Sequence, residues 1–502
     1  MQEKIVTLYK NGNTIYIDPT SDYMFELLKP VLSFTERKCY FGYEATQRKQ
    51  QNLAVFELQN HSLLDVDHKQ RIVTFYGFFA LIRQTLTKAG YTVKFKDLSP
   101  MAAEKLEPQW KNISSYKLRA NQNEFLQKIL ANRCGRFDCP PGFGKSFMIG
   151  LIAALLPKAT IDVVTRRVSV LRDRIYPELC QMVGDVGIVG GSKNVRNKRV
   201  MCYTVGSLGH SPATSDFLIG DECHELSADK AAGELVRWQN SRNFGLSASH
   251  DLRWDGKDFR NLGLFGPVIF KVNYAQAQSA NMVVPIHVKW TSVVMDQDPC
   301  MDAADIQKKR QGIWCNDYRN RRIAEDAQRY DDNTQVLITV ETIEHALNLK
   351  KQLPNFTLVY MENGLSKKDI EYYARRGFCK EDEPLMDLDR RQKLTQDFEK
   401  GVLKKVICTT VWNVGVSFNS LAVLIRADGG GSPINDIQIP GRVSRISADK
   451  PYGQIHDYLD QFNYTFKTRA KNRSTSYALN NWQQDFPSAG LQKEYHRITP
   501  AF

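Results

Sequence analysis

The chain has 502 residues, of which 42% are hydrophobic and 25% charged, the composition of a globular protein with roughly three or four domains. Its formal net charge of +13 favours a polyanionic partner such as nucleic acid. The ten cysteines include no Cys-x-x-Cys pair, so the sequence indicates neither a disulfide framework nor a zinc site. The longest apolar run, residues 147–156, is too short to span a bilayer, and the N-terminus lacks the apolar stretch of a signal peptide. We therefore expect a cytoplasmic protein with no membrane partner.

The first hundred residues predict a small α+β module. β-Branched and aromatic residues indicate strands, and an amphipathic pattern ending at Gly90 indicates a helix. We expect strands over 13–18, 71–76 and 91–96 and a helix over 77–86. No nucleotide-binding motif occurs here, so we assign residues 1–100 to a separate module and expect residues 97–115, which contain two prolines, to be a linker.

From about residue 116 onward, strands alternate with helices in two successive series. The expected strands are 161–164, 199–203, 217–220 and 244–247 in the first series, and 335–340, 356–360, 405–408 and 422–425 in the second. Such alternation predicts an α/β protein with two parallel, doubly wound sheets. We place the two sheet domains at residues 101–284 and 285–460, with a basic C-terminal extension over 461–502. Residues 365–388 are charged and predict an irregular insertion.

A glycine loop begins the chemistry of this chain. Residues 138–146 read Asp-Cys-Pro-Pro-Gly-Phe-Gly-Lys-Ser. Gly142 and Gly144 let backbone N–H groups face a triphosphate at the N-terminus of the next helix. Lys145 can reach the β- and γ-phosphates of ATP, and Ser146 can ligate Mg²⁺. Cys139 stands where the strict pattern has glycine, and an ordinary tight turn is the alternative.

An acidic pair ends an apolar strand about 75 residues later. Residues 218–224 read Leu-Ile-Gly-Asp-Glu-Cys-His. Asp221 can hold the metal through water, and Glu222 can polarise the attacking water for in-line hydrolysis. Taken alone, such a pair is more often a solvated strand end, but its position after the glycine loop favours the catalytic interpretation.

A Gln-x-x-Gly-Arg-x-x-Arg pattern follows about 300 residues after the glycine loop. It comprises Gln438, Arg442 and Arg445. The two guanidinium groups can stabilise the charge that develops on a γ-phosphate, and Gln438 can help to place water or phosphate. A basic helix face is the alternative for this segment alone.

The motifs together resemble those of superfamily 2 helicases, over roughly residues 116–460. The resemblance implies two RecA-like domains and an adenine-reading element at Arg119 and Gln122, for which a surface helix start is the alternative. It also implies that loop residues Pro141 and Phe143, together with Gly415, help to hold the nucleotide. Contacts to the nucleic-acid backbone are implied for Thr165, Arg166, Thr204, Thr409 and Thr410.

Residues 245–256 resemble motif III of the Rad25/UvsW branch of that superfamily. The segment Gly-Leu-Ser-Ala-Ser carries serines where threonines are usual, and His250 replaces a proline. The resemblance implies that His224 senses the γ-phosphate and contacts Ser247 and Ser249, which would couple hydrolysis to movement.

Residues 189–193 and 274–285 and the separate N-terminal module resemble those of bacteriophage UvsW-like helicases. This resemblance implies an ATP-dependent DNA helicase or translocase that remodels branched DNA, by fork or Holliday-junction branch migration, in phage recombination, repair or replication. The implied setting is the host-cell cytoplasm, with a monomer as the motor unit and replication or recombination proteins as candidate partners. The N-terminal module would help to engage DNA.

Two other functions stay open at this point. An RNA-dependent ATPase would use the same nucleotide motifs, and a nucleotide-switched DNA clamp would bind ATP with little hydrolysis. The cations of residues 467–473, together with Tyr464, Tyr477 and Trp482, indicate either a solvated tail or part of a nucleic-acid track.

Overall fold

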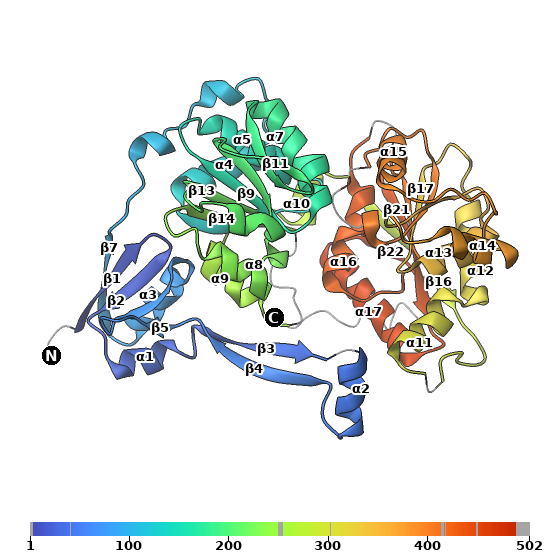
Figure 1. The fold of residues 1–502 in the computed structure, drawn as a ribbon, viewed down its shortest axis with the longest axis horizontal. Helices are drawn as coiled ribbons and strands as arrows, with labels where there is room; N and C mark the ends of the chain where they lie inside the picture. The colour runs from blue at the N-terminus through green and yellow to red at the C-terminus, as the bar shows by residue number, and fades with distance from the viewer. Residues whose placement is uncertain are drawn as a thin grey trace. The chain divides into compact units, whose positions relative to one another are not determined.

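A computed structural model describes residues 4–40, 42–248, 255–301, 303–412, 416, 418–447 and 450–487 (Figure 1). The chain forms two compact units. The first comprises Met1–Cys139 and Gly144–Val272, and the second comprises Pro140–Phe143 and Asn273–Phe502. None of the helices within the described ranges is both long and apolar enough to cross a membrane.

The first unit opens with a mixed five-stranded sheet in the order β5-β6-β2-β1-β7. Its strands are β1 (Lys4–Asn11), β2 (Thr14–Asp18), β5 (Asp65–Val66), β6 (Ile72–Phe75) and β7 (Tyr91–Asp97). Two helices, α1 (Asp22–Leu28) and α3 (Phe79–Lys88), supply apolar side chains such as Leu28 and Ile82 to the shared core. The predicted strands and helix of this α+β module are therefore present, and β1 adds a strand that the sequence reading did not include.

A separate antiparallel hairpin projects from the same module. It consists of β3 (Ser33–Cys39) and β4 (Phe56–Ser62), and α2 (Gly42–Gln50) lies in the connection between them (Figure 1). The strands contain almost no β-branched residues, so their sequence gave little sign of a sheet.

The second part of the first unit is an eight-stranded sheet in the order β11-β10-β12-β9-β13-β14-β8-β15. Its strands are β8 (Cys134–Asp138), β9 (Ile161–Thr165), β10 (Val186–Gly190), β11 (Lys193–Val195), β12 (Val200–Thr204), β13 (Phe217–Asp221), β14 (Arg242–Ser247) and β15 (Val268–Lys271). Among the described residues, the strands of this sheet pair in parallel except β10 with β11. The helices include α4 (Ala120–Ala131), α5 (Lys145–Leu155), α7 (Tyr176–Val183), α8 (Asp229–Leu235) and α9 (Asp258–Phe265).

The parallel register of this sheet aligns the carboxyl ends of its central strands. Thr204 is the partner of Thr165, and Asp138 is the partner of Ser247. Asp221 ends β13, the strand between β9 and β14. Ligands of open α/β sheets bind outside this edge, so the register gathers the predicted motif residues where a ligand is expected.

The second unit contains a seven-stranded parallel sheet in the order β18-β19-β17-β20-β21-β16-β22. Its strands are β16 (Ile286–Val293), β17 (Val336–Thr339), β18 (Thr357–Val359), β19 (Lys405–Cys408), β20 (Val423–Arg426), β21 (Gly453–Asp460) and β22 (Gln483–Asp485). Its helices include α10 (Tyr274–Ser279), α12 (Asp317–Gln328), α13 (Ile343–Gln352), α15 (Leu388–Glu399), α16 (Pro433–Gln438) and α17 (Tyr464–Leu479). The prediction of two parallel-sheet domains in an α/β protein is therefore confirmed.

Two local expectations change in the second unit. Residues 367–375 form a helix, α14 (Lys367–Arg375), because Ser366 and Asp369 make a capping box, so this part of the expected insertion is not irregular. Arg473 of α17 is neither a solvated tail residue nor an exposed cation. It is buried, with its guanidinium 3.0 Å from a carboxylate oxygen of Asp457.

Candidate active site

The glycine loop joins β8 to α5. Gly142 and Gly144 have φ values of 89° and 90°, a left-handed conformation that only glycine adopts without strain. Gly144 is the N-cap of α5, so the first N–H groups of that helix have no partner within it and are available to an anion. Cys139 is buried, and this burial holds the pKa of its thiol well above the usual range. At position 139, where the strict pattern has glycine, this chain therefore carries a neutral, buried thiol.

Lys145 and Glu222 form a buried ion pair at the carboxyl edge of the sheet. The Nζ atom of Lys145 lies 2.6 Å from Oε1 of Glu222, and their side chains are 8% and 15% exposed. Glu222 has φ 49° and ψ 53°, a left-handed conformation that costs about 1–3 kcal/mol for a residue other than glycine. Tertiary structure holds Glu222 in this conformation, directly after the strand that ends at Asp221.

Burial and the charges at this edge shift the pKa values of Lys145, Asp221 and Glu222. Burial raises the pKa of Glu222, but the neighbouring positive charges, chiefly the ammonium of Lys145, together outweigh burial, so the pKa of Glu222 is lowered overall. Burial and then the charge of Glu222 raise the pKa of Asp221. Burial lowers the pKa of Lys145, whereas the charges of Glu222 and Asp221 raise it, and the net direction is upward. The pair therefore keeps Glu222 ionised and Lys145 protonated, as a general base and a phosphate ligand require.

The residues predicted to hold Mg²⁺ fit that ion. Ser146 Oγ and Asp221 Oδ1 are both buried, and neither has a hydrogen-bond partner in the described structure. Mg²⁺ prefers oxygen ligands and usually keeps several waters, so one hydroxyl and one carboxylate suit it. No group of three or more His, Cys, Asp or Glu side chains suitable for a metal occurs among the described residues.

His224 connects the acidic pair to the neighbouring strand. Its Nδ1 atom lies 2.8 Å from Oγ of Ser247 and 3.5 Å from Oε2 of Glu222. The carbonyl of Ser247 accepts a 2.8 Å hydrogen bond from the amide of Cys139, at the start of the glycine loop. The structure thus brings His224 and Ser247 together, while Ser249 falls outside the described residues.

The upstream pair begins α4 beside the glycine loop. The backbone N–H of Arg119 donates a 3.1 Å hydrogen bond to Oε1 of Gln122, and Gln122 is buried. A Cβ atom added at Gly144 would lie 3.8 Å from Nε2 of Gln122. Gln122 therefore lies next to the loop, whereas Arg119 is exposed.

The residues predicted to contact nucleic acid lie at two further strand ends. Thr165 and Thr204 pair in register, and both side chains are buried. The hydroxyl of Thr204 lies 3.1 Å from that of Ser207. Arg166 is exposed, so it is the one of these three whose side chain is available to a phosphate backbone.

The remaining predicted residues lie in the second unit. Thr409 and Thr410 follow β19, the former buried and the latter exposed, whereas Gly415 lies outside the described residues. Arg442 is buried in a short 3₁₀ helix, donates a 2.9 Å hydrogen bond to the carbonyl of Val416 and lies over the ring of Phe418. Gln438 and Arg445 are half-buried on either side of this helix.

Arg174 is a charged neighbour of the site that sequence reasoning missed. It is half-buried in a π-helical turn, Leu171–Ile175. Its positive charge contributes to the lowered pKa of Glu222 and partly offsets the upward shift in the pKa of Asp221. π-Helical turns are rare and often mark functional positions. The insertion of one residue changes which side chains face the site, so helical periodicity in the sequence could not indicate Arg174.

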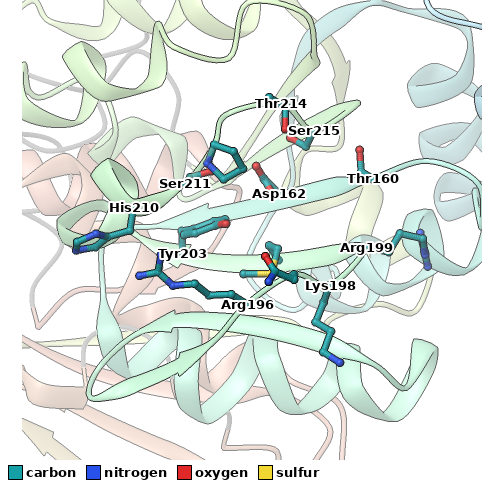
Figure 2. A pocket seen from close by; sticks show the side chains of 13 residues that line it. Thr160, Asp162, Arg196, Lys198, Arg199, Tyr203, His210, Ser211, Thr214 and Ser215 are labelled. Atoms are coloured by element: carbon teal, nitrogen blue, oxygen red, sulfur yellow. The ribbon is translucent and has the colours of Figure 1, made fainter.

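A separate pocket of about 480 Å³ lies near the opposite ends of β9 and β12 (Figure 2). Its lining includes Thr160 and Asp162, at the beginning of β9, whereas the nucleotide motifs lie at strand ends. Asp162 is buried and accepts a 2.8 Å hydrogen bond from Nε1 of Trp238. Burial raises its pKa to about 6. The pocket is therefore distinct from the candidate active site.

Comparison with known proteins finds a family model that matches part of the chain and relatives that match longer stretches. Residues 320–447 match the model of the helicase conserved C-terminal domain. The chain is 24% identical over 268 residues to a protein named as helicase 22 of Sulfolobus islandicus filamentous virus, spanning 51% of this chain and 44% of that protein. It is also 21% identical over 356 residues to the DNA 3'-5' translocase XPB2 of Sulfurisphaera tokodaii, spanning 66% of this chain and 79% of that protein. Over these stretches the chain is similar to known helicases and translocases.

Solved structures show the same architecture. A fragment of an HsdR subunit of a type I restriction enzyme from Vibrio vulnificus YJ016 aligns with 88% of this chain and 81% of its own, with a TM-score of 0.52 and 15% identity. At this identity the likeness shows the fold alone, which is that of two RecA-like domains. The structure of T4 UvsW aligns with 96% of this chain and 98% of its own, with 16% identity and a TM-score of 0.40, too low to support an inference.

Proposed function

We propose that this chain is an ATP-dependent superfamily 2 DNA helicase or translocase that remodels branched DNA, by migration of forks or Holliday junctions. One observation carries the enzymatic part of the proposal. A buried Lys145–Glu222 pair lies beside two buried oxygens, of Ser146 and Asp221, that have no hydrogen-bond partner within the described structure. A buried polar atom without a partner is costly, so this arrangement favours a site built to receive a phosphate and a metal ion.

The chain's own residues divide the work of hydrolysis. Lys145 would exchange Glu222 for the phosphates of ATP, and the released carboxylate would orient the attacking water. Ser146 and Asp221 would hold Mg²⁺, which neutralises phosphate charge when bound. Arg442 and Arg445 would stabilise the charge of the transition state, and Gln438 would position water or phosphate. Arg119 and Gln122 would recognise the adenine.

The substrate class rests on charge and on similarity. The net charge of +13 favours a polyanion, and the translocase from Sulfurisphaera tokodaii is named for action on DNA. Contacts from Arg166 and Thr410 would be to phosphates, with Thr165, Thr204 and Thr409 supporting them from buried positions. Such binding should weaken steeply with salt and show little sequence preference.

Branched DNA is proposed because a second folded module accompanies the motor. The N-terminal sheet packs directly on the first parallel-sheet domain, where Asn13 donates a 2.5 Å hydrogen bond to the carbonyl of Trp238. A motor and an attached module can hold two arms of one junction. We propose residues 1–100 as this module, 101–284 and 285–460 as the motor domains, and 461–502 as the C-terminal segment. Phage recombination, repair or replication is the proposed setting.

The test measures ATP turnover with no nucleic acid, single-stranded DNA, duplex DNA, tailed duplex DNA, four-way junctions and duplex RNA, at matched salt. We expect stimulation by DNA and ATP-driven processing of four-way junctions. Equal or greater activity on RNA would contradict the substrate class. Activity confined to simple tailed duplexes would leave a helicase and remove branch migration, and binding of ATP with negligible turnover would indicate a nucleotide-switched clamp.

A further inference from the structure

The β3–β4 hairpin has two chemically different faces. The alternation of its strands places Phe34, Glu36 and His61 on one face and Arg37, Phe56 and Leu58 on the other. On the first face, Phe34 and Glu36 are buried and His61 is half-buried, and Lys38 farther along it is exposed. On the second face, Leu58 is 65% exposed and Phe56 36%. A two-stranded hairpin is marginally stable in water, so the buried face must account for its stability.

The buried face is fixed to the motor just after the motif III segment. Oε1 of Glu36 forms an ion pair with Nζ of Lys257 at 2.9 Å, and the same Nζ lies 2.7 Å from a carboxylate oxygen of Asp229. The backbone N–H of Arg37 donates a 3.2 Å hydrogen bond to the carbonyl of Asp255. The two segments approach so closely that a Cβ atom added at Gly256 would lie 2.4 Å from the carbonyl oxygen of Thr35. These contacts orient the hairpin relative to the first parallel-sheet domain.

The exposed face combines a cation, an aromatic ring and an aliphatic side chain. The guanidinium of Arg37 lies over the ring of Phe56, 4.2 Å from its centroid, and Leu58 is the cross-strand partner of Arg37. Thr35 and Asn60 continue this face toward the base of the hairpin, joined by a 2.8 Å hydrogen bond. Both strands are fully described, and their two carboxylates, Glu36 and Glu57, lie on the opposite face.

We propose that this exposed face binds single-stranded nucleic acid, with bases stacked on the Arg37–Phe56 pair and on Leu58. Aromatic rings and guanidinium planes are sequence-tolerant stacking surfaces for bases, and the exclusion of carboxylates from the face suits a polyanion. Duplex DNA presents no free base faces, so the surface is matched to unpaired strands, such as those at a branch point. This inference rests on the proposed function and names the residues through which the N-terminal module takes part in it.

The test uses the full chain and fluorescence anisotropy with a labelled oligo-dT and a blunt duplex of the same length. Phe56→Ala and Arg37→Ala should each weaken binding to oligo-dT about fivefold or more. A loss of about fivefold in affinity is the smallest effect expected when one base–aromatic stack is removed. Binding to the duplex should change less than twofold. Tyr23→Ala is the matched control, because Tyr23 is an aromatic residue of the same module with 60% exposure and lies on α1, away from the hairpin. Phe56→Trp should retain binding and so separate stacking from folding.

The outcomes separate this inference from the proposed function. If the wild-type chain binds oligo-dT and neither substitution weakens it, the hairpin surface is wrong while the helicase proposal stands. Equal weakening on oligo-dT and duplex would overturn base stacking and leave a phosphate contact. Failure of Phe56→Trp to restore binding when Phe56→Ala weakens it would also contradict stacking. If the wild-type chain neither binds nucleic acid nor hydrolyses ATP in its presence, the proposed function itself fails.

Discussion

Nζ of Lys145 lies 2.6 Å from Oε1 of Glu222, so the proposed phosphate-binding cation and the proposed catalytic base neutralise each other. Burial makes this mutual neutralisation strong, because water does not screen the two charges effectively. A bound triphosphate would compete for Lys145 and leave Glu222 free to orient water. The pair would thus link nucleotide binding to activation of the proposed base.

Lys145→Ala should abolish ATP hydrolysis and also destabilise the protein. Removing one partner of a buried ion pair costs about 3–5 kcal/mol, and the partial exposure of Glu222 favours the lower part of this range. Thermal denaturation should show a lowered midpoint for Lys145→Ala that is partly restored by adding Glu222→Gln. Lys158→Ala, at an exposed lysine, is the control and should behave as wild type. Substantial ATPase activity in Lys145→Ala would refute the role of the glycine loop.

Glu222→Gln should bind ATP but hydrolyse it at least about 10²-fold more slowly, because an amide cannot act as a general base. The substitution keeps the shape of the side chain and an acceptor for Lys145. Binding is measured with a fluorescent ATP analogue and turnover by phosphate release. Loss of nucleotide binding, with the fold intact, would show that Glu222 is not the base.

Ser247→Ala should lower the number of base pairs separated per ATP hydrolysed. The substitution removes the hydroxyl that lies 2.8 Å from Nδ1 of His224, the contact that joins the acidic pair to β14. Unwinding and phosphate release are measured on the same samples, with Ser114→Ala as a control in an exposed turn. An unchanged ratio would mean that the contact does not couple hydrolysis to movement.

Arg442→Ala should lower kcat by about 10³-fold or more while changing nucleotide affinity far less, if Arg442 stabilises the transition state. Because Arg442 is buried and donates to the carbonyl of Val416, a thermal melt must accompany the kinetics. Arg442→Lys keeps the charge but not the planar fork, and should also be slow. A wild-type kcat in a folded Arg442→Ala variant would place this arginine outside the catalytic site.

Asp162→Asn should stabilise the protein at pH 7.5 and have little effect near pH 4. Burial raises the pKa of Asp162 from 3.8 to about 6, so the folded state binds a proton more tightly than the unfolded state. Stability from this group is present below pH 4 and is lost as the pH rises through about 6, by about 2–3 kcal/mol. The asparagine carries no charge and still has an acceptor for Trp238. Thermal midpoints of variant and wild type at both pH values test this, and an equal difference at both would contradict it.

Local sequence determined the nucleotide motifs and the alternation of strands and helices. The left-handed backbone at positions 142 and 144 favours glycine there. The apolar runs before Asp221 and at 161–164 form buried parallel strands, as their residue types alone predict. Such features arise from residues close together in the chain. Backbone conformation and strand burial therefore followed directly from residue type and order.

Tertiary structure alone decided which polar groups meet and which are buried. The hairpin strands are polar and contain almost no β-branched residues, and they are held through Glu36 by Lys257, more than 200 residues away. Arg473 belongs to a basic stretch in the sequence, but Asp457 makes its burial tolerable. Arg174 approaches the acidic pair through a π-helical turn that no periodicity reveals. In each case the energy depends on a partner distant in sequence, because a charge can be buried only where the fold supplies its counterpart.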